Sequence, residues 1–283
     1  MRTNTILLTA AAMVAFAANS VLCRLALGAG LIDASSFATV RTVSGAVMLG
    51  IALMLRSGKP QAKPDWRSVI TLYLYMVFFS FAYLSLSAGT GALVLFGAVQ
   101  LTMFIVALRS GEHFSPLSWV GLVLAIAGLV YLVSPGITAP DPFGAGLMAV
   151  AGVAWGFYSL VGRSAGDPTE ATAYNFIFSV PLVIVTSLVF LGDFQVSLAG
   201  VLYAVASGAI ASGIGYVIWY AALRGLTATS AATVQLSVPV IAAVGGVMLM
   251  SEDVTLRLVI ASVATLGGVA VVLTQRNRTP GTG

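Results

Sequence analysis

One charged side chain, Arg41, lies inside an apolar stretch of the sequence that is long enough to cross a membrane. It follows Asp33 by eight residues, which at 1.5 Å per helical residue places it about 12 Å from the end of that stretch. A guanidinium at this depth normally faces a cavity or a partner, and its planar fork of donors matches a carboxylate. We therefore expect Arg41 either to bind a substrate carboxylate or to brace a neighbouring helix by bonding its carbonyls.

Three amide side chains, Asn19, Gln100 and Gln235, also lie inside apolar stretches. Gln235 stands one helical turn before Pro239, a residue that has no N–H and leaves a backbone carbonyl without its helical partner. These amides could bind the amino or carboxyl group of a substrate, or they could hydrogen-bond between helices. We expect Pro181 and Pro239 to kink their helices and to act as hinges.

Aromatic side chains are concentrated in three apolar stretches, at 67–88, 142–162 and 197–222. A cavity walled by rings with few polar groups suits a small amphipathic ligand that has an apolar side chain. Ordinary helix packing is the alternative for any one ring. The six aromatic residues that we expect at a binding site are Phe79, Tyr83, Trp155, Tyr158, Tyr216 and Trp219.

Groups that perform catalysis or hold metals are scarce. Cys23 and His113 are the only residues of their types, which excludes an intramolecular disulfide and metal sites built on several cysteines or histidines. The nine acidic residues all fall at the ends of apolar stretches or between them. We therefore expect no enzyme activity, cofactor or metal, and the absence of a deep carboxylate argues against cationic drugs as the main substrate.

The composition is that of a helical membrane protein. Of 283 residues, 59% are hydrophobic and 8% are charged, against roughly 25% charged in a soluble domain. Soluble enzymes, disordered proteins and nucleic-acid binders are excluded, and the partners that we expect are membrane lipid and a small-molecule substrate, with no nucleic acid. Ten apolar stretches predict ten transmembrane helices: 5–27, 32–55, 67–88, 90–109, 115–134, 142–162, 170–191, 197–222, 227–250 and 254–274.

The basic residues predict the orientation of these helices. If the N-terminus is cytoplasmic, ten Lys and Arg residues fall on the inside, whereas only Arg24 and Arg257 fall on the outside. Both termini are therefore expected in the cytoplasm, and the chain in the inner (plasma) membrane.

The two halves of the chain share landmarks at a constant spacing. Residues 12–24 parallel 151–163 at a shift of 139, and 110–112 parallel 250–252 at a shift of 140. We therefore expect residues 1–137 and 138–283 to be two five-helix repeats within one integrated transmembrane domain. An odd number of helices inverts the second copy, an arrangement found in secondary transporters that bind substrate near the midplane.

The matching segments also resemble a known family. The order aromatic, small, any residue, Asn or Tyr, Ser and, four positions on, Arg occurs from Phe16 to Arg24 and from Trp155 to Arg163. Together with the run that ends at Pro239 and the later Glu252, it resembles the EamA-type repeats of the drug/metabolite transporter superfamily. The resemblance implies a ten-helix metabolite exporter that works by alternating access, with a weaker likeness to YddG-type exporters of aromatic and other amino acids. The first repeat departs from the pattern, because it has Val99 where the second has Pro239.

We therefore expect a secondary transporter that exports amino acids, meaning aromatic and other small zwitterionic metabolites, through a central aromatic-lined cavity. A monomer suffices for this interpretation, although the sequence leaves the oligomeric state open. Exporters of phosphorylated sugars or nucleotide-sugars, which need several basic residues in the cavity, remain alternatives with the same fold, as do exporters of cationic compounds. An intramembrane enzyme or a channel finds less support, because paired carboxylates and filter-like loops are missing from the sequence.

Overall fold

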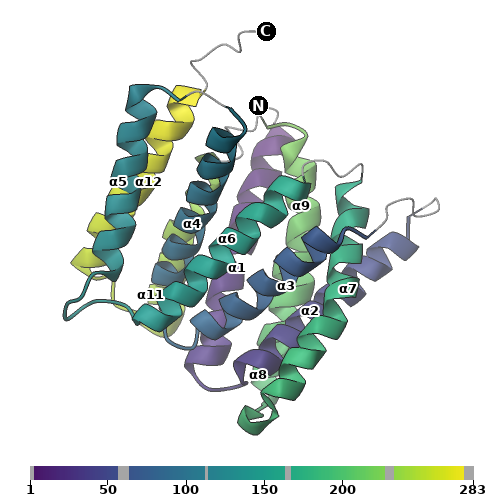
Figure 1. Cartoon of the computed structure of the whole chain (residues 1–283). Coiled ribbons are helices and arrows are strands. Elements are labelled where there is room, and N and C mark those ends of the chain that lie inside the picture. The colour runs from purple at the N-terminus through teal and green to yellow at the C-terminus, as the bar shows by residue number, and fades with distance from the viewer. Residues whose placement is uncertain (1–2, 57–63, 112–113, 163–166, 227–232, 277–283) are drawn as a thin grey trace.

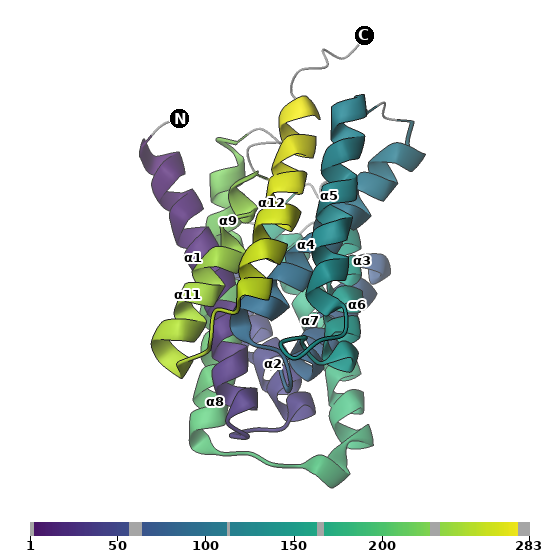
Figure 2. The ribbon, with the colours of Figure 1, turned by 90° about the vertical axis from the view of Figure 1, so that its left-hand side faces the viewer.

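A computed structural model of the protein describes residues 3–56, 64–111, 114–162, 167–226 and 233–276. These residues form a bundle of roughly aligned helices in which α1 begins and α12 ends at the same end (Figures 1 and 2). The first half contains α1 Thr3–Gly28, α2 Ala34–Met54, α3 Trp66–Ala82, α4 Ala88–Arg109 and α5 Pro116–Val133. The second half contains α6 Pro142–Gly162, α7 Pro168–Val189, α8 Leu198–Val205, a π-helix Ala206–Ile214, α9 Gly215–Leu223, α11 Val238–Met250 and α12 Leu256–Arg276.

Among the described residues, nine helices are long and apolar enough to cross a membrane, and α3 is a shorter apolar helix. The rod formed by α8, the π-helix and α9 counts as one of the nine, Leu198–Ala222. The prediction of an all-helical, multi-pass membrane protein is therefore confirmed for the described part of the chain. Which side the termini face stays a prediction.

Polar residues at the ends of the apolar stretches start the helices. Side chains of Asp33, Ser87 and Ser197 each accept a hydrogen bond from a backbone N–H of the helix that follows. Such caps satisfy N–H groups that have no partner within the helix. Small polar residues that break up the apolar sequence thus set where each helix begins.

One predicted helix boundary is wrong, and another predicted helix is interrupted. The predicted helix 67–88 ends at Ala82, because the chain turns at Tyr83 and Ser87 caps a new helix, α4. In the predicted helix 227–250, residues 227–232 lie outside the described part, 233–235 are helical, 236–237 form a turn, and α11 begins at Val238. Pro239 therefore does not kink the middle of a helix. It lies in the first turn of α11, where the missing N–H costs no helical bond.

Pro181 lies inside α7, as predicted. The helix assignment continues through this proline from Pro168 to Val189. A hinge at Pro181 stays a prediction.

Helix pairs of the first half recur in the second half. α3 and α4 pack against α6, and correspondingly the α8–α9 rod and α11 pack against α1. The remaining large contacts are of two kinds. Equivalent helices contact each other, namely α2 with α7, α4 with α11, and α5 with α12, and α2 packs against the π-helix as its equivalent α7 packs against α3. Each of these contacts therefore has a counterpart between the equivalent helices, as a two-repeat architecture produces.

The equivalent helices α5 and α12 pack antiparallel at one edge of the bundle (Figures 1 and 2). A side-chain carbon at Gly268 would collide with the Gly121 backbone, so the two glycines permit a close approach. Toward the other end of the pair, the Arg257 guanidinium donates to the carbonyls of Leu132 and Ser134, which end α5. The start of α5 therefore lies beside the second half of α12, and the end of α5 lies beside the start of α12. This is the antiparallel arrangement that an inverted repeat requires.

The equivalent helices α2 and α7 are clamped at both ends. At one end, Asp33 accepts a hydrogen bond from the Gln195 N–H (3.2 Å), and Ile32 forms an antiparallel bridge with Val196. At the other end, Arg56 forms an ion pair with Asp167 (2.8 Å). In both cases, the carboxylate that caps one helix binds the segment that follows the other helix, so α2 and α7 are also antiparallel.

The clamps make stability depend on pH. Burial opposes ionisation of Asp33, but hydrogen bonds from Ser35, Ser36 and Gln195 outweigh it and hold the pKa of that carboxyl below its usual range. Burial likewise opposes ionisation of Asp167, and the Glu170 N–H and the Arg56 guanidinium reverse the balance and lower its pKa. Carboxyls whose pKa is lower in the folded state stabilise the protein above the ordinary Asp value of about 4, and that stabilisation is lost as the pH falls through the folded values.

We therefore expect the thermal midpoint of the purified protein in detergent to fall below about pH 4. Asp167→Asn should reduce the free energy of unfolding at pH 7 by less than about 1 kcal/mol, because the ion pair is partly exposed. The difference between this variant and the wild type should disappear as the pH approaches 2. A difference that stays constant with pH would contradict the role given to the clamp.

Candidate functional site

Arg41 lies in α2 with 0% of its surface exposed. Its Nη2 donates a hydrogen bond to the Tyr75 hydroxyl (3.1 Å) from α3. The guanidinium carbon lies 5.2 Å from the centre of the Tyr75 ring and 4.7 Å from that of Phe79, a distance at which ring faces attract cations. The charge is therefore held by an aromatic pair and one hydroxyl.

Two of the three guanidinium nitrogens of Arg41, Nε and Nη1, have no hydrogen-bond partner among the described residues. Buried donors of a charged group are costly when they are unsatisfied. Two other arginines show how a structural brace is built in this protein: Arg24 donates to the carbonyls of Tyr83 and Leu84, and Arg257 to those that end α5. Arg41 shows no such carbonyl contact in the described residues, which favours a ligand-binding role over a brace.

A hydrogen-bonded chain connects Arg41 to the second repeat. The Asn19 amide donates to the Tyr75 hydroxyl (3.2 Å), and Ser207 Oγ donates to Asn19 Oδ1 (2.6 Å). These residues belong to α1, α3 and the π-helix, and Arg41 adds α2. The chain thus joins four elements across the interface between the halves.

The π-helix Ala206–Ile214 lies directly against Arg41. π-Helical segments are rare and often occur at functional sites. Gly208 packs so close to α2 that a side-chain carbon there would collide with the Arg41 carbonyl and Ser44 Oγ. The Ser212 hydroxyl is buried and, among the described residues, has no hydrogen-bond partner.

This close contact predicts the effect of a single methyl group. Gly208→Ala should force α2 and the π-helix apart and lower the free energy of unfolding by about 1–3 kcal/mol, the usual cost of overpacking. The matched control is Gly50→Ala on α2, where an added carbon meets no atom within 4 Å. Thermal unfolding in detergent should show a lower midpoint for the first variant only. Equal midpoints would mean that the two elements are not in close contact.

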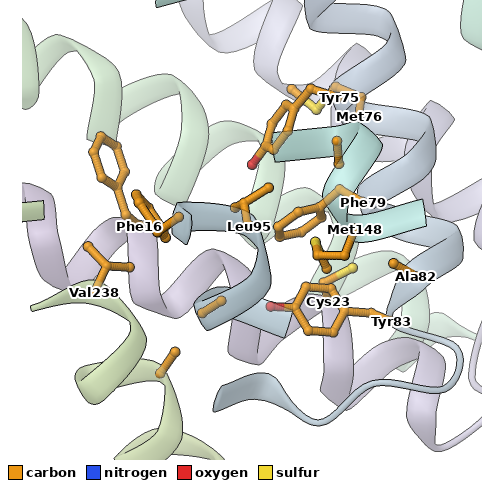
Figure 3. Close-up of a cluster of buried hydrophobic side chains, with 14 of the residues drawn as sticks. Phe16, Cys23, Tyr75, Met76, Phe79, Ala82, Tyr83, Leu95, Met148 and Val238 are labelled. Carbon is orange, nitrogen blue, oxygen red and sulfur yellow. The ribbon is translucent and has the colours of Figure 1, made fainter. Parts of the chain in front are cut away.

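A cavity of about 20 Å³ lies beside the hydrogen-bonded chain, with room for about one water molecule. Residues of both halves surround it, and an amino acid fits only if the helices move apart. The lining residues are Phe16, Asn19, Ser20, Tyr75, Phe79, Leu95, Phe96, Trp155, Ala211, Ser212 and Tyr216. Figure 3 shows Tyr75 and Phe79 directed from α3 toward Leu95, with Phe16 on the other side.

The structure brings the six predicted aromatic residues into one network of contacting rings. Trp155 is central, with ring centres 4.7 Å from Tyr75, 5.2 Å from Tyr158 and 5.3 Å from Tyr216. Phe16 joins Tyr216 to Trp219, and Phe79 joins Tyr75 to Tyr83. The network therefore extends through both repeats.

The predicted residues divide into two groups around the cavity. Asn19, Phe79, Trp155 and Tyr216 line it, and Arg41 contacts two of its lining residues. The predicted residues that do not line it are Tyr83, Tyr158, Trp219, Gln100 and Gln235. The Tyr83 hydroxyl instead donates to the Ala88 carbonyl (3.4 Å), and Gln100 is buried in α4.

Sequence reasoning missed Tyr75, Ser207 and Ser212 as site residues. For Tyr75 a signal existed: with Phe79 and Tyr83 it recurs every four residues, the spacing of one helical face. For the two serines the signal was weak, because small residues in membrane helices usually mark packing.

An ion pair ties several elements together at one end of the bundle. Arg24 Nε contacts Glu252 Oε1 at 3.0 Å, and the other carboxylate oxygen accepts a hydrogen bond from the Ala88 N–H (2.9 Å). With the Arg24 bonds to the turn after α3, the pair ties α1 to the turn between α3 and α4 and to the end of α11. Cys23, which precedes Arg24 directly, and Tyr83, whose carbonyl accepts from Arg24, are buried and lie near each other in Figure 3.

Comparison with known proteins places these features in a family. Residues 3–134 and 142–274 each match the EamA-like transporter family. "Uncharacterized protein PA1977" of Pseudomonas aeruginosa is 48% identical over 274 residues, covering 96% of each chain. An "Uncharacterized transporter" of Archaeoglobus fulgidus is 26% identical, covering 98% of this chain and all of its own length. A solved structure titled "Crystal structure of protein" has the same fold, with a TM-score of 0.66, 22% identity, and coverage of 97% of this chain and 99% of that one.

Proposed function

This chain belongs to the EamA-like transporter family, and from that membership we propose that it exports amino acids and other small zwitterionic metabolites by alternating access. The single observation that carries the proposal is the buried Arg41 guanidinium, two of whose nitrogens have no partner in the described residues, beside a ring-lined cavity. Secondary transporters with inverted repeats bind substrate where the repeats meet. Asn19, Ser207 and Arg41 connect the repeats at this position.

In the proposed cycle, the substrate carboxylate accepts hydrogen bonds from Arg41 Nε and Nη1. Its apolar side chain packs against the rings of Phe16, Trp155 and Tyr216, which line the cavity. The Arg24–Glu252 pair holds one end closed, and its opening gives access from that side. We place this end outside the cell and both termini in the cytoplasm, with the chain in the inner (plasma) membrane, on the distribution of basic residues.

The charges of the described residues favour this substrate over cations. Acidic side chains there lie in or next to the segments between helices, or in the first turn of α7. A transporter of cationic compounds is expected to carry a carboxylate near the midplane of the membrane. Phosphorylated sugars or nucleotide-sugars would need several basic groups, whereas Arg41 is the one buried arginine in the described interior.

Transport by the purified protein in liposomes tests the proposal. Counterflow of labelled phenylalanine, leucine, alanine, lysine and glutamate, and of quaternary ammonium compounds, is measured with and without a pH gradient. We expect the apolar amino acids to exchange faster than lysine. Movement of quaternary ammonium compounds without movement of any amino acid would overturn the proposal.

A further inference from the structure

Three buried polar atoms in or beside the cavity wall have no partner among the described residues, and all three can donate a hydrogen bond. Arg41 Nε and Nη1 are buried without partners among the described residues, and the same holds for Ser212 Oγ on the cavity wall. The Tyr75 oxygen accepts hydrogen bonds from both Arg41 and Asn19, which leaves its own hydrogen for a third partner. The one amide oxygen on this wall, Asn19 Oδ1, already accepts a hydrogen bond from Ser207. The site therefore matches a group rich in acceptors.

The buried charge beside the cavity, on Arg41, is positive. Within the described residues, the one buried acidic side chain is Glu170. It lies in the first turn of α7, where it has its own interactions, at the end of the bundle at which Asp167 pairs with Arg56. Arg56 is 15 residues from Arg41, or about 22 Å along α2 at 1.5 Å per residue. No described carboxylate lines the cavity to balance a second positive charge.

From these two observations we infer that the preferred substrates are monoanionic aromatic or apolar carboxylic acids that lack an α-ammonium group. The inference rests on the proposed function, keeps its carboxylate site at Arg41, and shifts the preferred substrates from zwitterions to monoanions. A carboxylate neutralises Arg41, so the complex with a monoanion carries no net charge. A zwitterionic amino acid places its ammonium group in the same apolar interior without a carboxylate partner, and burial of an unpaired ion is unfavourable.

Attraction between the ammonium group and the aromatic wall does not offset the cost of burying that group. Ring faces attract an ammonium group, but the Tyr216 ring already contacts Phe16 edge to face at 5.9 Å and Trp155 in a tilted arrangement at 5.3 Å between ring centres. They therefore provide an apolar surface for a side chain more than an open cage for a cation. The substrate's aromatic or aliphatic body occupies this surface.

Direct binding to the full-length protein in detergent tests the inference without interference from passive leakage of weak acids. Three ligands that share one aromatic skeleton are compared by titration calorimetry at pH 7.5: 3-phenylpropanoate, L-phenylalanine and 2-phenylethylamine. We expect 3-phenylpropanoate to bind at least tenfold more tightly than L-phenylalanine, and 2-phenylethylamine to bind least. Ser212→Ala should weaken both carboxylates several-fold, whereas the matched control Ser237→Ala, at an exposed serine before α11, should change neither.

The outcomes separate the inference from the proposed function. Equal or tighter binding of L-phenylalanine would overturn the preference for monoanions and leave amino-acid export in place. Preferential binding of 2-phenylethylamine would overturn both, and so would a failure of all three ligands to bind together with an absence of amino-acid counterflow. Binding of 3-phenylpropanoate that survives Arg41→Met unchanged would also overturn the inference, because the carboxylate would then lie elsewhere.

Discussion

Arg41→Met abolishes transport and leaves the protein at least as stable as the wild type: this is the result that we expect from the position of this side chain. Methionine resembles the unbranched aliphatic part of arginine in length, but it removes the positive charge and all five N–H donors. Loss of two charge-assisted hydrogen bonds to a substrate carboxylate costs about 3 kcal/mol, which corresponds to roughly a 100-fold loss of affinity. Liposome counterflow measures the loss directly.

The stability of this variant separates a binding site from a brace. In the wild type, Arg41 is fully buried with one hydrogen bond and two partnerless nitrogens among the described residues. Replacing a poorly satisfied buried charge by an apolar residue is often neutral or stabilising. The thermal midpoint of Arg41→Met should therefore equal or exceed that of the wild type, a common trade of stability against function.

Arg257→Met is the matched control, because this arginine binds the carbonyls at the end of α5 at the edge of the bundle. It should show the opposite pattern, with lower stability and unchanged substrate affinity. If Arg41→Met retained full transport with unchanged affinity, the binding site would be wrong. A large loss of stability in that variant would instead identify Arg41 as a brace.

Breaking the Arg24–Glu252 pair is expected to expose Cys23. Cys23 is the only cysteine of the chain, has 0% of its surface exposed and precedes Arg24 directly. The ion pair is largely buried, with 23% and 15% of the two side chains exposed. Its loss should cost the closed state about 1.5 kcal/mol, roughly a tenfold increase in the open population.

Labelling with a membrane-impermeant maleimide measures this opening. Arg24→Gln should increase the labelling rate of Cys23 about tenfold, even though removal of a nearby cation disfavours the reactive thiolate. Glu252→Gln should act similarly, and the double variant should add little, because both changes remove the same interaction. Arg257→Gln is the control that leaves the rate unchanged, and Cys23→Ser should abolish labelling. Unchanged rates in both single variants would show that the pair does not hold the bundle closed.

Much of the architecture could be predicted from the sequence, because insertion of a helix into a membrane depends on local composition. Apolar stretches of about 20 residues identify the spanning helices wherever polar caps such as Asp33 and Ser197 separate them. The errors occurred where composition does not change. Tyr83 is as apolar as the helix before it, yet the chain turns there and its carbonyl binds Arg24. Pro239 looks the same in sequence whether it kinks a helix or starts one.

The site was predictable only in part, and for a related reason. Arg41 stood out because a charge in an apolar stretch is costly and therefore rare. Its partners did not, because Tyr75, Ser207 and Ser212 are ordinary components of membrane helices. Gln100 and Gln235 looked equally suitable as site residues, but neither lines the cavity.

Composition and internal repetition alone predict a helical membrane protein with two similar halves and one deeply placed arginine. Which groups meet became visible only in the assembled bundle: Arg24 with Glu252 across 228 positions, and Asn19 with Ser207 across 188. The cause lies in the solvent. In lipid, the faces of a helix that pack against protein are as apolar as those that face the membrane, so hydrophobic periodicity does not mark them. Helix contacts then follow from close fit and a few hydrogen bonds, which exist only once the bundle is assembled.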